Sequence, residues 1–232
     1  MAKKWYYPKI ITKIINKFFL DRYHDDPKKR DELAHWVGEA LKKSDNDHFE
    51  YFYTKEFGFD KSYYTNKRIL DIGCGPSGTL EWADNALERV GVDPLANDYL
   101  KLGARKHKMK YVNSGSEAIP FENEHFDTIF SFNAMDHVDD VEASVKEIRR
   151  LLKPGGHFLL ITECNHPPRI TEPAYIPLDF VEKYFFDYKI HDCHWYVSFG
   201  DRIYDTLKTN KVEVSVPEKN VSYILKAHFI KP

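Results

Sequence analysis

The sequence predicts a doubly wound α/β fold, in which a mostly parallel sheet of about seven strands carries helices on both faces. Two observations support this prediction. From Lys67 onward, short apolar segments alternate five times with turns and amphipathic segments, as in a parallel sheet with crossover helices. A glycine-rich turn also follows the first apolar segment directly. We expect the last strand to run antiparallel and a helical extension to precede the sheet.

The extension, residues 1–65, has a helical pattern. Apolar residues between Ile11 and Phe19 recur at the spacing of one helix face, and Asp25-Asp26-Pro27 is typical of the start of a second helix, expected over 28–43. The following segment, 48–64, is rich in aromatic residues. We expect residues 1–65 to form a helical cap or lid and residues 66–232 to form the main domain.

The remaining elements follow from apolar runs and their boundaries. A helix at 96–103 ends at a glycine, and the helix at 140–152 has one apolar face. A tight turn is expected over the sequence Lys153-Pro154-Gly155-Gly156. Further helices are expected at 79–88 and 178–186, and a loop of about two dozen residues before the last strand. The strands are expected at 68–73, 89–93, 109–113, 126–133, 157–164, 188–197 and 221–230.

Composition excludes several classes of protein. The formal net charge of −2 gives no general attraction to nucleic acid. The three cysteines are far apart and fit no C-x-x-C pattern, which favours a reducing compartment, and we expect the protein to be cytoplasmic. No apolar stretch reaches the roughly 18 residues of a membrane span, and the N-terminus lacks the pattern of a signal peptide.

The glycine-rich turn is the most informative motif. An apolar strand ends in Asp71, and Gly73, Gly75 and Gly78 follow. Glycine adopts positive φ and lets a ligand approach the backbone, so a nucleotide-like ligand is expected over this turn. The spacing also satisfies the dinucleotide fingerprint.

The glycine turn is followed by further motifs in a characteristic order. Through these motifs, residues 67–164 resemble a class I S-adenosylmethionine-dependent methyltransferase of the small-molecule, UbiE-like type, with a Rossmann-like fold. The resemblance implies that Asp71 helps to hold the amino group of the methionine moiety. It implies that the glycine turn carries the carboxylate and ribose of the cofactor on backbone N–H groups. Asp93, at the end of the second strand, matches the acid that binds both ribose hydroxyls, and Leu95 matches an apolar contact of the adenine. A helix cap before Pro94 is the alternative for Asp93.

The segment 113–121 resembles the adenine-binding stretch of the family but departs from it. Gly115 stands where an aspartate commonly meets the adenine amine, and Ser116 stands where a backbone N–H meets a ring nitrogen. The contact with the amine is then left to Glu117, Ser114 or water.

The end of the fourth strand matches the part of the family that flanks the sulfonium and the methyl acceptor. The resemblance implies that Asn133 and Met135 pass along the cofactor and that His137 faces the acceptor as a general base. A helix-start residue bonded to its own backbone is the alternative for His137. Asp136 either orients His137 or caps the next helix.

The loop 165–177 lies at the same edge of the predicted sheet. His166, Arg169 and Glu172 are its candidates for acceptor binding, and a surface connection is the alternative. A metal is not expected. The residues His191, Cys193 and His194 lack a ligand spacing, because strand alternation puts His194 on the opposite face from the other two.

The sequence therefore predicts methyl transfer from S-adenosylmethionine to an oxygen or nitrogen of a small polar metabolite, such as a sugar or a secondary metabolite. An NAD-dependent oxidoreductase is a second hypothesis, since the glycine spacing and Asp93 fit that fingerprint too. A non-catalytic binding subunit with a methyltransferase-like fold is a third. The oligomeric state is left open.

Overall fold

The computed structural model describes residues 25–40, 47–200, 203–209 and 211–232. The chain divides into two compact units, Met1–Ser44 and Asp45–Pro232, and each is described by itself. The described part of the first unit contains helix α2 (Pro27–Ala40). Asp26 begins this helix, because its carboxylate accepts the N–H of Lys28 at 2.9 Å and proline follows at the first helical position. The predicted start of the second helix is confirmed, whereas the helix expected around 11–19 lies outside the described residues.

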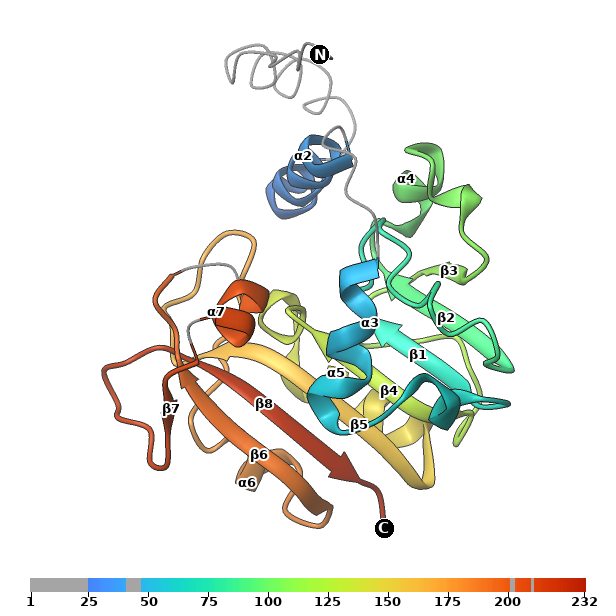
Figure 1. Cartoon of the computed structure of the whole chain (residues 1–232). Helices are drawn as coiled ribbons and strands as arrows, with labels where there is room; N and C mark the ends of the chain where they lie inside the picture. Colours follow the sequence, from blue (N-terminus) through green and yellow to red (C-terminus); the bar gives the residue numbers. More distant parts are fainter. Residues whose placement is uncertain (1–24, 41–46, 201–202, 210) are drawn as a thin grey trace, which may run out of the picture. The chain divides into compact units, whose positions relative to one another are not determined.

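In the described part of the second unit, eight strands form one sheet in the order β3-β2-β1-β4-β5-β8-β6-β7 (Figure 1). The five strands from β3 to β5 run parallel, and β8, β6 and β7 pair antiparallel. This confirms the predicted parallel sheet with an antiparallel final strand. The strands are β1 (Arg68–Ile72), β2 (Glu88–Asp93), β3 (Lys110–Asn113), β4 (Phe126–Phe132), β5 (Leu152–Cys164), β6 (Lys189–Val197), β7 (Glu213–Val214) and β8 (Tyr223–Ile230).

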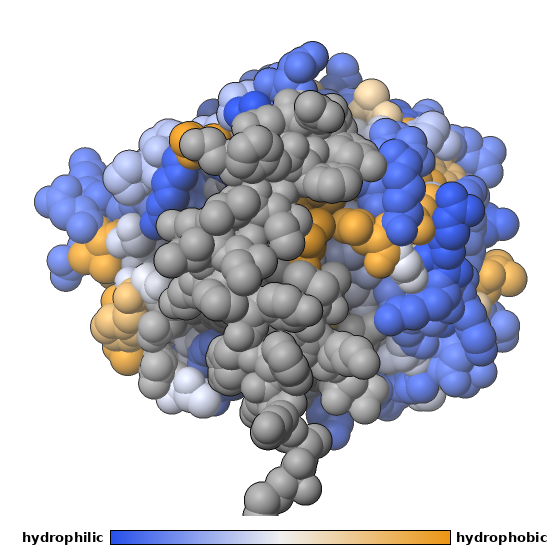
Figure 2. All heavy atoms as spheres, turned by 90° about the horizontal axis from the view of Figure 1, so that it is seen from above, coloured by the Kyte–Doolittle hydropathy of each residue, from blue (hydrophilic) through white to orange (hydrophobic). Residues whose placement is uncertain are grey.

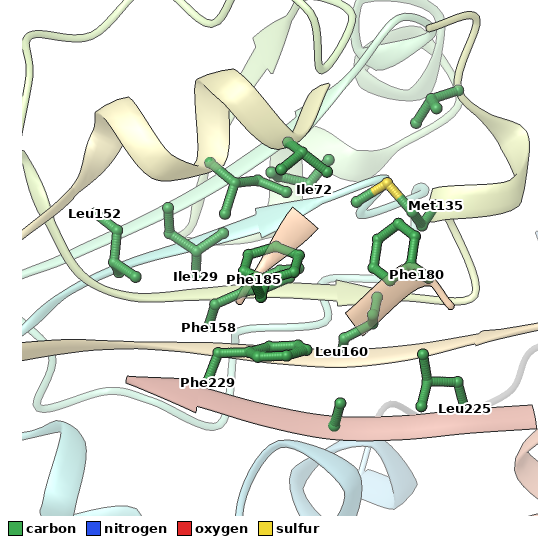
Figure 3. Close-up of a cluster of buried hydrophobic side chains, with 14 of the residues drawn as sticks. Ile72, Ile129, Met135, Leu152, Phe158, Leu160, Phe180, Phe185, Leu225 and Phe229 are labelled. Carbon is green, nitrogen blue, oxygen red and sulfur yellow. The ribbon is translucent and has the colours of Figure 1, made fainter. Parts of the chain in front are cut away.

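Helices cover both faces of this sheet. Because strand side chains alternate, Leu70 and Ile72 join one hydrophobic cluster, and Ile69 joins another. The first cluster is closed by α5 (Val141–Leu151) and α6 (Phe180–Tyr184), and Figure 3 shows its phenylalanine side chains packed between the elements. The second is closed by α3 (Asp47–Tyr53) and α7 (Ile203–Thr209). The remaining helical elements are α4 (Ala96–Lys101) and 3₁₀ turns at Lys55–Phe57, Lys61–Tyr64, Ala104–Lys106 and Met135–His137.

The helix expected at 79–88 is not formed, which corrects the sequence analysis. The chain passes from Gly78 to β2 through successive turns, in which the N–H of Glu81 donates to Gly78 and that of Ala83 donates to Leu80. Leu80 and Ala83 are still buried. Asp84 and Asn85 follow, and such residues favour turns over helix interiors because their side chains compete for backbone groups.

Several boundaries differ from those expected: α4 ends at Lys101 before the glycine, and α6 and β8 are shorter than expected. Two further differences change the elements themselves. The predicted tight turn at 153–156 is instead part of β5, whose register shifts where Phe126 pairs with Leu152 and Thr128 pairs with His157. The predicted loop before the last strand contains α7 and the short strand β7. Neither difference alters the carboxyl edge of the parallel strands.

The surface of the described residues carries both hydrophilic and hydrophobic side chains. On the face in Figure 2, hydrophilic side chains cover most of the described surface, and hydrophobic side chains gather in separate groups between them. Within the described residues, the helices are too short or too polar to span a bilayer.

Candidate functional site

The glycine turn begins where β1 ends. Gly73, Gly75 and Gly78 have φ values of 74°, 56° and 67°, the left-handed region that glycine adopts readily. A Cβ on Gly73 would also overlap the Cβ of Ala134, which follows β4. The N–H of Gly73 donates to the carbonyl of Val92 at 2.8 Å. The turn therefore requires glycine and holds the ends of three strands together.

Asp71 is a buried carboxyl group in the last part of β1. Its Oδ2 accepts a hydrogen bond from the Tyr53 hydroxyl at 2.9 Å and another from the Thr79 hydroxyl. Burial raises the pKa of Asp71 to about 7, and the nearby Asp93 carboxylate adds to that increase, while the two hydrogen bonds oppose it. A cation beside Asp71 would lower its pKa, so the group suits a positively charged ligand.

Asp93 lies at the end of the neighbouring strand β2. Its Oδ1 accepts the N–H of Leu95 at 2.9 Å, and its Oδ2 accepts the N–H of Gly75 at 3.2 Å. An ionised carboxylate has about four acceptor sites, so each oxygen is able to take a ligand hydroxyl beside its backbone partner. Leu95 is buried at the start of α4. In the structure Asp93 thus supports the chain before α4 and shapes the glycine turn, and its role toward a ribose stays a prediction.

The segment after β3 is held by its own side chains. The Ser116 and Ser144 hydroxyls lie 2.7 Å apart, and the Ser114 hydroxyl lies 2.9 Å from the carbonyl oxygens of residues 115 and 118, either of which accepts its hydrogen. Glu117 accepts the N–H groups of Asp139 and Asp140, which fixes the segment to the start of α5. Its other oxygen occupies the space that a side chain at position 115 would fill.

The residues after β4 differ in exposure. Asn133 is exposed, has a φ of 54° and donates its N–H to the carbonyl of Ile161 at 2.7 Å. The side chain of Met135 is fully buried in the hydrophobic cluster of Figure 3, so a ligand at this point would meet its backbone. His137 is partly exposed, with Nε2 at 4.0 Å from Oδ1 of Asp136, and its N–H donates to the carbonyl of Ala134.

The loop after β5 folds back onto Asp136. His166 is buried, and its Nε2 lies 3.5 Å from Oδ2 of Asp136, which raises the pKa of His166. Arg169 is exposed and pairs with Glu172 at 2.5 Å. Oxygens of Asp136, Glu163 and Glu172 and a ring nitrogen of His166 all lie within 4.8 Å of one another.

The structure brings several of the predicted site residues together and adds two residues that the sequence analysis did not single out. Asp71, Asp93 and the glycine turn meet at one edge of the sheet. Thr79 and Tyr53 join Asp71. A hydroxyl residue directly after Gly78 was a usable signal for Thr79, whereas nothing local distinguishes Tyr53 from the other aromatic residues of its segment.

Comparison with known proteins gives a family for the central part of the chain. Residues 70–160 match the family described as a methyltransferase domain. The malonyl-[acyl-carrier protein] O-methyltransferase of Enterobacter lignolyticus is 36% identical over 96 residues, covering 41% of this chain and 38% of that protein. The ubiquinone biosynthesis O-methyltransferase of Cereibacter sphaeroides is 30% identical over 146 residues, covering 61% of this chain and 58% of that protein.

Solved structures agree on the fold. A putative S-adenosylmethionine-dependent methyltransferase from Listeria monocytogenes aligns with a TM-score of 0.57 and 14% identity, over 80% of this chain and 99% of that chain. The chain spans less than two thirds of the length of the curated relatives named above.

Proposed function

Since residues 70–160 match a methyltransferase-domain family, we propose that this chain is a class I S-adenosylmethionine-dependent methyltransferase that transfers a methyl group to an oxygen or nitrogen of a small polar metabolite. The observation that carries the proposal is the pair of buried aspartates, Asp71 and Asp93, at the ends of adjacent strands beside the glycine turn.

The polar groups of the site suit the ammonium, ribose, carboxylate and adenine groups of this cofactor. Asp71 is a buried acid suited to an ammonium group, and the carboxylate of Asp93 suits a ribose diol. The N–H groups of Gly73, Gly75 and Gly78 donate to Val92, Asp93 and Tyr111, so the cofactor carboxylate is assigned to the rest of the turn's backbone. The backbone N–H of Ser116 is assigned to the adenine, with Leu95 as an apolar contact. Asn133 and the backbone of Met135 run beside the sulfur end in this proposal.

The bound cofactor supplies the methyl group on a positively charged sulfur and also the leaving group. This chain aligns the acceptor with that carbon, and such positioning contributes roughly 7–11 kcal/mol in well-oriented reactions. A hydroxyl acceptor loses a proton as it reacts. His137 is proposed to take this proton, and its Nε2 lies 4.0 Å from Oδ1 of Asp136.

Acceptor binding is assigned to the loop 165–177. Arg169 and Glu172 form an ion pair on the loop and offer opposite charges to a polar acceptor. His166 is buried next to Asp136, and its Nδ1 contacts the carbonyl of Pro167 in the same loop.

Calorimetric titration tests the cofactor assignment. We expect micromolar binding of S-adenosylhomocysteine and none of NAD. Asp93→Ala is expected to lower that affinity at least tenfold, whereas His137→Ala keeps it and lowers turnover of a labelled cofactor in an acceptor screen by roughly 10²–10⁴-fold. Binding of NAD alone would favour the oxidoreductase hypothesis, and cofactor binding without turnover of any acceptor would favour a binding subunit.

A further inference from the structure

A second cluster of polar side chains lies at the carboxyl edges of β4 and β5. It consists of Asp136 after β4, Glu163 near the end of β5, and His166 and Glu172 in the loop that follows. Asp136 and His166 are each 1% exposed, and the side chains of Glu163 and Glu172 are partly buried. Three carboxylates and one imidazole thus converge, each with a potential ligand atom within 4.8 Å of the others.

The imidazole of His166 points into this cluster with a nitrogen that lacks a partner. Its Nδ1 lies 2.9 Å from the carbonyl of Pro167, which assigns the N–H of the neutral imidazole to Nδ1 and leaves a lone pair on Nε2 in that form. Nε2 is buried, has no hydrogen-bond partner among the described residues and faces Oδ2 of Asp136 at 3.5 Å. Two acceptors that face each other in a buried place are unfavourable unless a proton or a metal ion lies between them, and the carboxylate of Asp136 favours either.

The charges around the cluster also favour a cation. Arg169 approaches from the outside, with Nη1 at 2.5 Å from Glu172 and 3.9 Å from Glu163. Its side chain is 56% exposed, so it is able to turn toward solvent when the carboxylates find another partner. Arg169 does not extend to the inner pair, Asp136 and His166, in any ion pair of the described residues.

We propose that Asp136, Glu163, His166 and Glu172 bind a divalent metal ion, with Mn²⁺ as the best fit. Carboxylates suit Mn²⁺ and Mg²⁺, while imidazole favours transition metals, so a set of three oxygens and one nitrogen selects a first-row divalent ion. Metal–ligand bonds of about 2.0–2.2 Å place adjacent ligand atoms roughly 3.0–3.5 Å apart. The 3.5 Å between His166 and Asp136 is at that spacing, and the two glutamates reach it by side-chain rotation.

Outer contacts already orient these ligands. The Thr162 hydroxyl lies 3.4 Å from Oδ1 of Asp136, and the Ser198 hydroxyl donates to Oε1 of Glu163 at 3.1 Å. With the carbonyl of Pro167 on His166, three of the four ligands have a second partner that fixes their direction. Such support is typical of metal sites and distinguishes this cluster from a group of exposed acids.

The position of the ion gives it a role in the proposed reaction. Asp136 directly precedes His137, so the ion lies beside the proposed base. Four protein ligands leave coordination positions for oxygens of an acceptor, and a bound hydroxyl loses its proton more readily. This role rests on the proposed methyl transfer, whereas binding of the ion does not. The acceptor class is then a metabolite with two adjacent oxygens, such as a vicinal diol or a hydroxy acid.

The test uses the full chain, stripped with a chelator and titrated with Mn²⁺ by calorimetry and by electron paramagnetic resonance. We expect one site, with micromolar affinity. His166→Ala and Glu172→Gln are each expected to weaken binding at least tenfold. Arg169→Ala is expected to strengthen it severalfold, because the competing guanidinium is gone. His194→Ala is the matched control, since His194 also lies between two carboxylates, Asp192 and Glu213, and it should keep the affinity.

Affinity for S-adenosylhomocysteine and the melting temperature, measured in the same variants, report whether they are folded. The proposal is overturned if the stripped chain binds no Mn²⁺, or if Glu172→Gln and His166→Ala fold and bind it as the unaltered chain does. If the chain binds the metal but transfers no methyl group, the metal site is supported and the proposed function is refuted. If methyl transfer persists after chelation, the ion is not needed for that reaction.

Discussion

At the scale of single residues, Asp71 is the most unusual group of the site. It is buried and shares Oδ2 between two hydroxyl donors, and burial raises its pKa to about 7. An unfolded aspartate has a pKa of about 3.9. The folded chain therefore binds more protons than the unfolded chain between these two values, and this carboxyl lowers the free energy of unfolding as pH rises through that window.

Asp71→Asn is expected to remove this dependence. From pH 4 to pH 7 the unaltered chain should lose on the order of 2–4 kcal/mol relative to the variant, as measured by urea unfolding at each pH. Saturating S-adenosylhomocysteine should reduce the difference, because its ammonium group stabilises the ionised carboxyl. Parallel pH profiles for the two proteins would show that Asp71 titrates normally.

At the scale of elements, helix α3 connects the aromatic segment to the site. The ring of Tyr53 packs against Phe130 and Phe132 of β4, with centroids 4.9 and 4.5 Å apart, while its hydroxyl bonds to Asp71. One side chain thus joins the hydrophobic cluster to the carboxyl group. The sequence predicted the aromatic density of this segment but not this contact, because the two residues are 18 positions apart.

Tyr53→Phe tests this link, because it keeps the ring and removes the hydroxyl. Tyr64→Phe is the matched control: the Tyr64 hydroxyl is also buried but donates to the carbonyl of Tyr53. Each variant should lose about 1–2 kcal/mol of unfolding free energy. Only Tyr53→Phe should raise the pH at which S-adenosylhomocysteine reaches half its maximal affinity, since Asp71 loses a donor that lowers its pKa. Equal pH midpoints in calorimetry would contradict the link.

At the scale of the molecule, the chain separates into two compact units, and the sheet, α3 and all the candidate site residues belong to the second. The sheet buries apolar clusters on both faces within that unit. Residues 45–232 therefore contain a complete core of their own.

Removal of residues 1–44 is expected to leave a single cooperative unfolding transition, with a melting temperature within a few degrees of the full chain, by scanning calorimetry. S-adenosylhomocysteine affinity should also persist. A loss of cooperative unfolding would mean that the second unit needs the first.

The sequence by itself determined the parallel strands, the glycine turn and the positions of Asp71 and Asp93, because each depends on neighbours a few residues apart. Only the tertiary structure decided that β8 lies between β5 and β6, that turns replace the helix before β2, and that Tyr53 meets Asp71. It also brought His166 to Asp136, 30 positions away. The physical reason is that local pattern fixes which face of an element is apolar, whereas the surface that covers this face is chosen by packing of the whole chain.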